Sequence, residues 1–287
     1  MQAVRSILVV LDPHHAHSRA LTRAKLIAGV TGARLHLLMC DKKQEHSALL
    51  SLLSSQLHDD GYDNVSHEQI WKDSLHESII AVQQAEGCEL VIKEHSPDNP
   101  LRKALLTPSD WKLLRLCPSA VLMVKSERPW TGGVILAAVD VGNQDEDHRH
   151  LHASIIDHGF AIAGLTKGEL HVISAHPSPM LSASDPVLQL SESIERRYRE
   201  ACKAFQAEFD ISDDRLHVAE GPADVLIPYT EQKYDAVVTI IGTVSRTGIS
   251  GALIGNTAEV VLDALEGDVL VLKSEEAVQH LAELAQA

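Results

Sequence analysis

A glycine-rich stretch late in the chain has the residue types and spacing of an anion-binding loop. Residues 241–259 read IGTVSRTGISGALIGNTAE, in which four glycines precede Asn256 and Thr257, both good helix-capping residues. Several backbone N–H groups could therefore converge on a phosphate at the positive N-terminus of the following helix. The stretch lacks the Walker A, GxGxxG and GxSxG patterns. A glycine turn needed only for tight strand-to-helix packing is the alternative interpretation.

The rest of the chain shows no catalytic pattern. No nucleophile stands beside a base, and no carboxylate pair is placed by spacing, so we predict no catalytic residues. The histidines cluster in the loops after two strands, as His14, His15 and His17 and as His148, His150 and His152. A metal site needs three or four converging ligands, and only a local pairing of His148 and His152 is visible. We interpret these histidines as solvated and expect no metal site.

The elements that must position the glycine-rich stretch occur twice. Residues 6–12 (SILVVLD) are matched by residues 134–140 (VILAAVD), and both runs end in Asp. From Leu90 to Ser126 the second copy follows without a gap at an offset of 148 residues. The boundary falls in 127–133 (ERPWTGG), whose Pro and Gly suit a linker. The repeat predicts a first domain over 1–127, a second over 133–275 and a helical tail over 276–287.

Each half alternates short apolar runs with longer stretches of helical periodicity, which is typical of an α/β fold with a doubly wound parallel sheet. Strands are predicted at 5–12, 34–40, 65–71, 88–94 and 120–126, and at 133–141, 169–175, 215–220, 235–242 and 268–273. Helices are predicted at 16–30, 47–58, 75–86 and 109–116, and at 151–165, 194–209, 223–233 and 257–265. We expect five strands per half in the order 3-2-1-4-5. Ligands bind such sheets at the carboxyl ends of the strands, where the winding reverses.

Composition narrows the classes of partner and compartment. The 287 residues are 45% apolar but only 3% aromatic, as expected for Val-, Ile- and Leu-rich parallel sheets, and the four cysteines form no disulfide pattern. The formal net charge of -15 repels nucleic acids and anionic membrane surfaces, so we expect neither as a partner. Without a membrane-spanning run or a signal-peptide pattern, the chain is predicted to be cytoplasmic.

The glycine-rich stretch also resembles a known signature. Its spacing is similar to the G-x2-G-x9-G-[ST] signature of ATP-binding members of the universal stress protein family, and the tandem repeat resembles the E-type member over almost the entire chain. The resemblance implies two five-stranded parallel-sheet domains of the adenine nucleotide alpha hydrolase-like type. It also implies that the domains pair through their last strands and act in cytoplasmic stress survival. In one branch of the family ATP is bound.

By the family pattern, the second half would hold the nucleotide. Asp140 and Val141 would lie by the ribose or adenine, and the phosphates would be surrounded by Gly242, Thr243, Ser245, Arg246, Gly255, Asn256 and Thr257. Two departures weaken the match: Ser245 replaces the second Gly, and Asn256 replaces Ser or Thr. If position 245 needs a left-handed backbone, that conformation is about 1–2 kcal/mol less favourable for Ser than for Gly. We therefore expect a weakened ATP site.

The first half has lost the signature. The offset of 148 places Glu94, Pro97 and Thr107 at the positions of Gly242, Ser245 and Gly255. A carboxylate would oppose phosphate and Pro97 lacks an N–H donor, although Glu94 could instead be solvated beside Lys93. This half is expected to bind something else or to act as a scaffold.

These observations predict a stress-response protein with a nucleotide as ligand of its second domain and no catalytic role. Slow ATP hydrolysis or phosphotransfer at the second-half loop is an alternative, and an interaction scaffold without a small ligand is another. We expect the halves to form an intrachain pseudo-dimer through the strands at 120–126 and 268–274. The sheet edges could also recruit a second copy, which leaves a homodimer open.

Overall fold

The computed structural model describes residues 4–13, 18–95, 106–143, 145–176, 178, 191–243 and 256–284, with the backbone alone at 191–193, 256–259 and 284. The first half contains β1 (Ser6–Leu11), α1 (Arg19–Thr31), β2 (Arg34–Met39), α2 (Ser47–Asp59), β3 (Val65–Gln69), α3 (Leu75–Ala85), β4 (Leu90–Glu94), α4 (Pro108–Leu116) and β5 (Ala120–Val124). The second half contains β6 (Val134–Ala138), α5 (Glu146–Thr166), β7 (Glu169–His176), α6 (Ser191–Phe209), β8 (Leu216–Glu220), α7 (Ala223–Tyr234), β9 (Ala236–Thr243), α8 (Asn256–Ala264), β10 (Asp268–Lys273) and α9 (Glu275–Leu284). The alternation of strands and helices predicted from the sequence is confirmed.

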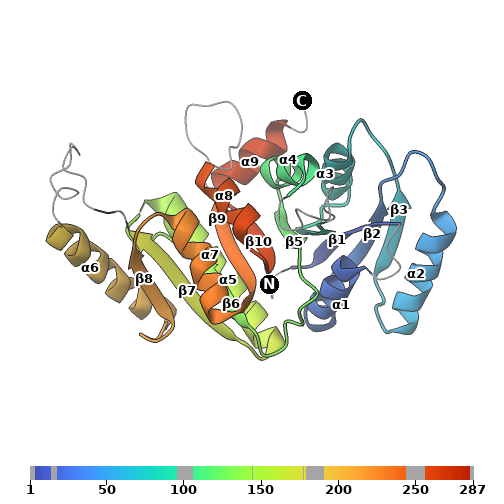
Figure 1. Ribbon diagram of the computed structural model, residues 1–287. Helices are drawn as coiled ribbons and strands as arrows, with labels where there is room; N and C mark the ends of the chain where they lie inside the picture. Colours follow the sequence, from blue (N-terminus) through green and yellow to red (C-terminus); the bar gives the residue numbers. More distant parts are fainter. Residues whose placement is uncertain are drawn as a thin grey trace.

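All the strands belong to one sheet, in the order β3-β2-β1-β4-β5-β10-β9-β6-β7-β8 (Figure 1). Each half therefore has the predicted order 3-2-1-4-5, with parallel strands throughout. The closing strands β5 and β10 pair antiparallel, with Leu122 opposite Leu270, so the two halves share a continuous sheet. The expected contact through the last strands is confirmed.

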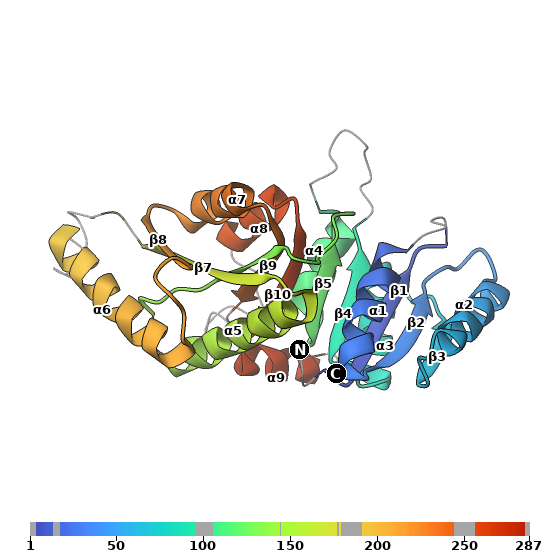
Figure 2. The ribbon, with the colours of Figure 1, turned by 90° about the horizontal axis from the view of Figure 1, so that it is seen from below.

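Helices cover both faces of the sheet, as buried parallel strands require (Figure 2). The core on one face combines side chains of α1, α2, α5 and α6, and the core on the other combines those of α3, α4, α7 and α8. Strand residues of β1 such as Ile7 and Leu8 are fully buried and alternate between the two cores. A ligand can therefore approach the sheet only at its ends or between helices.

The tail begins as a helix directly after β10. Ala277 and Leu281 of α9 are buried, as expected for an amphipathic helix that docks on the protein. Figure 1 shows α9 close to the junction of the halves, where it contacts α5. In the described ranges, none of the helices combines the length and hydropathy needed to cross a bilayer.

Candidate ligand site in the second half

Asp140 lies at the reversal of winding in the second half. It follows β6, whose neighbours in the sheet are β7 and β9, and its side chain is exposed. Gly242 and Thr243 end β9, the next strand along, and both are half-buried. The topology therefore brings the carboxylate and the start of the glycine-rich stretch to the edge of the sheet where doubly wound folds bind ligands.

The turn after β6 is held by side chains from two helices. Asp140 Oδ1 accepts hydrogen bonds from the Gly142 N–H at 3.0 Å and from the Tyr198 hydroxyl of α6 at 3.3 Å. The Asp140 N–H donates to Nε2 of His152 on α5 at 3.3 Å. These contacts fix the direction of the Asp140 carboxylate before any ligand arrives.

The histidine prediction is wrong for part of the second cluster. Helix α5 begins at Glu146, so His148 and His152 lie on a helix, and His152 is buried with its Nε2 accepting a backbone N–H. Burial lowers the pKa of His152 to about 4, which keeps the ring neutral. His148 is half-buried and bonds to Asp145 and Asn143, whereas His150 is exposed as predicted. His14, His15 and His17 lie outside the described residues; within those described, no three potential ligands gather into a metal site.

Tyr198 is a contact of this site that the sequence reasoning missed. Its ring lies so close to Gly142 that a Cβ at Gly142 would stand 2.4 Å from it. Burial, and then the Asp140 charge, raise the pKa of Tyr198 to about 12, so the hydroxyl keeps its proton and donates it to the carboxylate. Because α6 is distant from Asp140 in sequence, no local pattern links the two residues.

The predicted binding residues have different surroundings. Val141 is buried in the core, and its N–H donates to Ser174 Oγ at 3.2 Å, so it reaches the site only through its backbone. A Cβ on Gly242 would stand 2.6 Å from Leu151, which gives this glycine a packing role of its own. Asn256 and Thr257 begin α8, of which the first turns are described by their backbone. Ser245, Arg246 and Gly255 lie outside the described residues.

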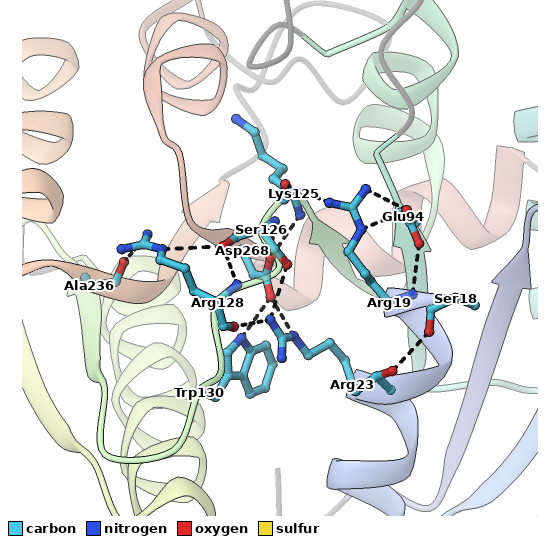
Figure 3. A network of polar contacts seen from close by, with 11 residues as sticks. Ser18, Arg19, Arg23, Glu94, Lys125, Ser126, Arg128, Trp130, Ala236 and Asp268 are labelled. Carbon is cyan, nitrogen blue, oxygen red and sulfur yellow. Dashed lines mark hydrogen bonds and ion pairs between the residues drawn. The ribbon is translucent and has the colours of Figure 1, made fainter. Parts of the chain in front are cut away.

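At the first-half counterpart Glu94 forms an ion pair with Arg19, and the alternative of a solvated Glu94 is wrong. Glu94 ends β4 and is 6% exposed. Its carboxylate accepts from the Arg19 backbone N–H at 2.9 Å and from the Arg19 guanidinium at 2.6 Å (Figure 3). A carboxylate of the protein thus sits at the positive N-terminus of α1, where its charge opposes that of an incoming phosphate.

Lys93, beside Glu94, is also neutralised internally. Its ammonium nitrogen lies 2.8 Å from Asp110, a carboxylate that is fully buried at the start of α4 and also bonds His95 at 2.9 Å. These hydrogen bonds and the Lys93 charge outweigh burial and hold the pKa of Asp110 well below its usual range. Thr107 caps the same helix through a capping box with Asp110. Thr107, which stands at the position of Gly255, therefore belongs to a network of hydrogen bonds and ion pairs within the protein.

A cavity of about 900 Å³ nevertheless remains at the carboxyl ends of β1, β2 and β4. Its wall includes both carboxylates and lysines, together with Trp71, and among the lining residues are Asp12, Asp41, Lys42, Lys93 and Glu94. Lys42 already lies 5.4 Å from the centre of the Trp71 ring. The wall thus has mixed charges rather than the concentrated N–H donors of a phosphate loop.

Comparison with known proteins agrees with this architecture. The profile of the universal stress protein family matches residues 3–125 and 134–273. Universal stress protein E of Escherichia coli K12 is 30% identical over 305 residues, covering 96% of both chains. The universal stress protein E homolog of Haemophilus influenzae is 30% identical over 300 residues, covering 94% of this chain and 97% of that one.

Two solved structures extend the comparison. A protein of unknown function from Pseudomonas aeruginosa PAO1 is 64% identical, with a TM-score of 0.92 and coverage of 99% of this chain and 98% of that one. A universal stress protein from Archaeoglobus fulgidus DSM 4304 is 16% identical, and the match covers 93% of this chain and 98% of that one. The two proteins share the fold, with a TM-score of 0.62. The chain thus belongs to the universal stress protein family, as a tandem E-type member that carries two of its domains.

Proposed function

We propose that this protein acts in the stress response by binding one adenine nucleotide of the ATP type, weakly and without catalysing its reaction, at the crevice of its second domain. The observation that carries the proposal is the contrast between the two crevices. At the second crevice the position of Glu94 is taken by Gly242, which carries no charge, and the exposed Asp140 forms no ion pair with the residues that the structure describes, whereas at the first Glu94 and Arg19 neutralise each other.

The geometry supports a binding role rather than a chemical one. The Asp140 carboxylate is directed by Tyr198 and Gly142, and an exposed carboxylate can accept hydrogen bonds from ribose hydroxyls. Among the described residues near it, Tyr198 holds a raised pKa and His152 is neutral with its Nε2 engaged, so neither is poised to activate a nucleophile. Two sequence departures, Ser245 and Asn256, support weak affinity.

Titration calorimetry with ATP and magnesium tests the proposal, using a matched pair of variants. Asp140→Ala removes the carboxylate after β6, and we expect affinity to fall about 10- to 100-fold, since a hydrogen bond to a charged group contributes about 1.5–3 kcal/mol. Asp12→Ala makes the same change after β1, and we expect no change in affinity. The parent should bind at most one ATP per chain.

Two further results decide between the alternatives. Gly255→Asp places a carboxylate in the glycine-rich stretch and should abolish binding if phosphates lie there. Release of phosphate from added ATP would favour slow hydrolysis instead, and no binding by the parent would favour a scaffold. Two ATP per chain, or equal losses in Asp12→Ala and Asp140→Ala, would contradict the proposal.

A further inference from the structure

Two histidines meet at the outer edge of the second half. His171 belongs to β7, and His217 belongs to β8, the last strand of the sheet (Figure 1). Nδ1 of His171 lies 2.9 Å from Nε2 of His217, which is a hydrogen-bond distance. Tyr234, the last residue of α7, stacks on His217 with the ring centres 4.3 Å apart, and its hydroxyl oxygen lies 3.3 Å from His217 Nδ1. The histidine pair therefore joins the edge strand to its neighbour and to the end of α7.

The bond between the rings requires that one of the facing nitrogens carry no proton. Whichever ring donates, the other must accept through a lone pair, so two imidazolium rings cannot keep the bond. Two charged rings would also repel each other, since their centres are 5.1 Å apart. Burial lowers the pKa of both histidines, and for His217, where the charge of His171 adds to the effect, to about 4. Both rings are therefore neutral at pH 7.

The charged groups around the pair do not compensate a double positive charge. Glu169 Oε2 lies 3.7 Å from His171 Nε2, but the other oxygen of Glu169 is paired with Arg215 at 3.0 Å. Asp214, in the turn before β8, attracts a proton to both rings, whereas Lys233 of α7 repels one from the ring of β8. Two carboxylates thus face two cations, and a second imidazolium meets no counter-charge of its own.

The first half has a matched edge with different chemistry. His36 of β2 is the counterpart of His171, because each lies opposite the third residue of the first strand of its half. His36 faces β3, the other edge strand, with Nδ1 at 2.8 Å from Ser66 Oγ and Nε2 at 3.2 Å from Glu68. Glu86 lies 3.7 Å from Nδ1. A proton on His36 therefore gains carboxylate partners, whereas a proton on each ring of the histidine pair loses a bond.

Strand β8 has little else to hold it. Each of its side chains is half-buried or exposed, and Val218 is 40% exposed. Its backbone pairs with β7, and it ends the order of strands in the sheet. Segments with little buried apolar surface open locally at a small cost in free energy, so the loss of one contact between strands can shift this equilibrium.

We propose that His171 and His217 form an acid-sensitive switch: as neutral rings they hold β8 against β7, and protonation of both releases β8 and the end of α7 while the other strands stay folded. Release leaves the backbone of β7 without its partner, open to pairing with another strand. Both rings lie near the amino ends of their strands, opposite the crevice at the carboxyl ends. The switch therefore does not depend on the proposed nucleotide site.

Hydrogen exchange of the full chain at pH 7 and pH 5, corrected for the intrinsic exchange rates, tests the switch. In the open form the rings regain their ordinary pKa of 6.5, so between about pH 6.5 and 4 the open form binds more protons and acid favours it. We expect exchange in β8 to be about tenfold or more faster at pH 5, and exchange in β3 to stay within about twofold.

Variants assign the response to the pair. His217→Gln keeps an amide that can bond to His171 but binds no proton, so the acid response of β8 should be lost. His171→Asn does the same from β7 and replaces the first variant if circular dichroism at pH 7 shows that it is unfolded. His36→Asn is the matched change in the first half, and β8 should then respond as in the parent.

Three outcomes would overturn the proposal. In the first, exchange in β8 is equally slow at pH 7 and pH 5. In the second, β3 or β6 opens to the same extent as β8, which would mean that acid unfolds the protein as a whole. In the third, a folded amide variant keeps the acid response of the parent.

Discussion

At the scale of single residues, Lys125 and Lys273, at the ends of the last strands of the two halves, have different contacts although the repeat makes them equivalent. Lys125 Nζ donates to the carbonyls of Leu262, at 2.9 Å, and Leu265 at the end of α8. Lys273 Nζ is buried near the Cys117 thiol and meets no acceptor in the described parts of the chain. Burial lowers the pKa of each lysine to about 8.

We expect Lys125→Met to lower the free energy of unfolding at pH 7 by about 1–3 kcal/mol, because two charge-assisted hydrogen bonds to a helix C-terminus are lost. Its counterpart Lys273→Met should be neutral or stabilising, since it removes an uncompensated buried charge. Urea denaturation of the two variants measures both changes. Equal destabilisation would show that Lys273 has an acceptor after all.

The lowered pKa of Lys273 also predicts a dependence on pH. Between about pH 8 and the ordinary value of 10.5, the folded chain binds fewer protons than the unfolded chain, so its stability rises with pH. Lys273→Met lacks this contribution and should gain less stability over that interval. Urea midpoints at pH 7, 8.5 and 10 compare the parent with the variant. If the midpoints of both proteins change with pH in the same way, the lowered pKa of Lys273 is contradicted.

At the scale of elements, the junction of β10, α1 and the interdomain linker depends on one buried carboxylate. Asp268 is fully buried and accepts from Arg23 Nε at 2.8 Å, Trp130 Nε1 at 2.8 Å, and the N–H groups of Lys125 and Ser126 at 2.9 Å (Figure 3). Arg23 also donates to the Arg128 carbonyl at 2.6 Å. One side chain thus fixes where the linker leaves the first domain.

Asp268→Asn should lower the free energy of unfolding by about 3–5 kcal/mol, because Arg23 would keep its charge in a buried site without a counter-ion. The matched change is Asp235→Asn, which removes the partner of Arg128 in an ion pair whose carboxylate is 85% exposed. Exposed pairs contribute about 0–1 kcal/mol, so this variant should be close to the parent. Chemical denaturation compares the two variants. Similar denaturation midpoints would mean that the buried network around Asp268 does not contribute to stability.

At the scale of the whole molecule, the continuous sheet couples the two halves. The pairing of β5 with β10 places Leu122 and Leu270, both fully buried, opposite each other at its centre. Neither half can unfold without exposing this seam, so we expect one cooperative transition rather than two.

The equivalent leucines Leu35 of β2 and Leu170 of β7 test the coupling. Each is buried, and replacing a core Leu by Ala lowers the free energy of unfolding by about 2–5 kcal/mol. If unfolding is global, Leu170→Ala should speed amide hydrogen exchange in β1 and β2, and Leu35→Ala should speed it in β6 and β7. Faster exchange confined to the mutated half would show that the halves unfold independently.

The sequence by itself determined the architecture. Alternating apolar runs and helical periodicity, occurring twice, predicted five strands per half and their order, because these follow from local patterns and from general rules of sheet winding. The contact through the last strands was implied by the resemblance to the universal stress protein family and by the need to cover two apolar sheet edges. It also placed Asp140 and Gly242 together, because both end neighbouring strands of such a sheet.

Only the tertiary structure decided what each site residue contacts. From the sequence alone, Glu94 could have been exposed to solvent, yet it is paired with Arg19, 75 residues away. The hydroxyl of Tyr198, on α6, donates to Asp140. Likewise, the spacing of His148 and His152 did not reveal that His152 is buried against the Asp140 backbone. Such contacts join residues that are distant in sequence, and burial sets both their pKa values and their partners. Local residue patterns therefore position a site, whereas long-range packing determines which of its groups remain free to bind.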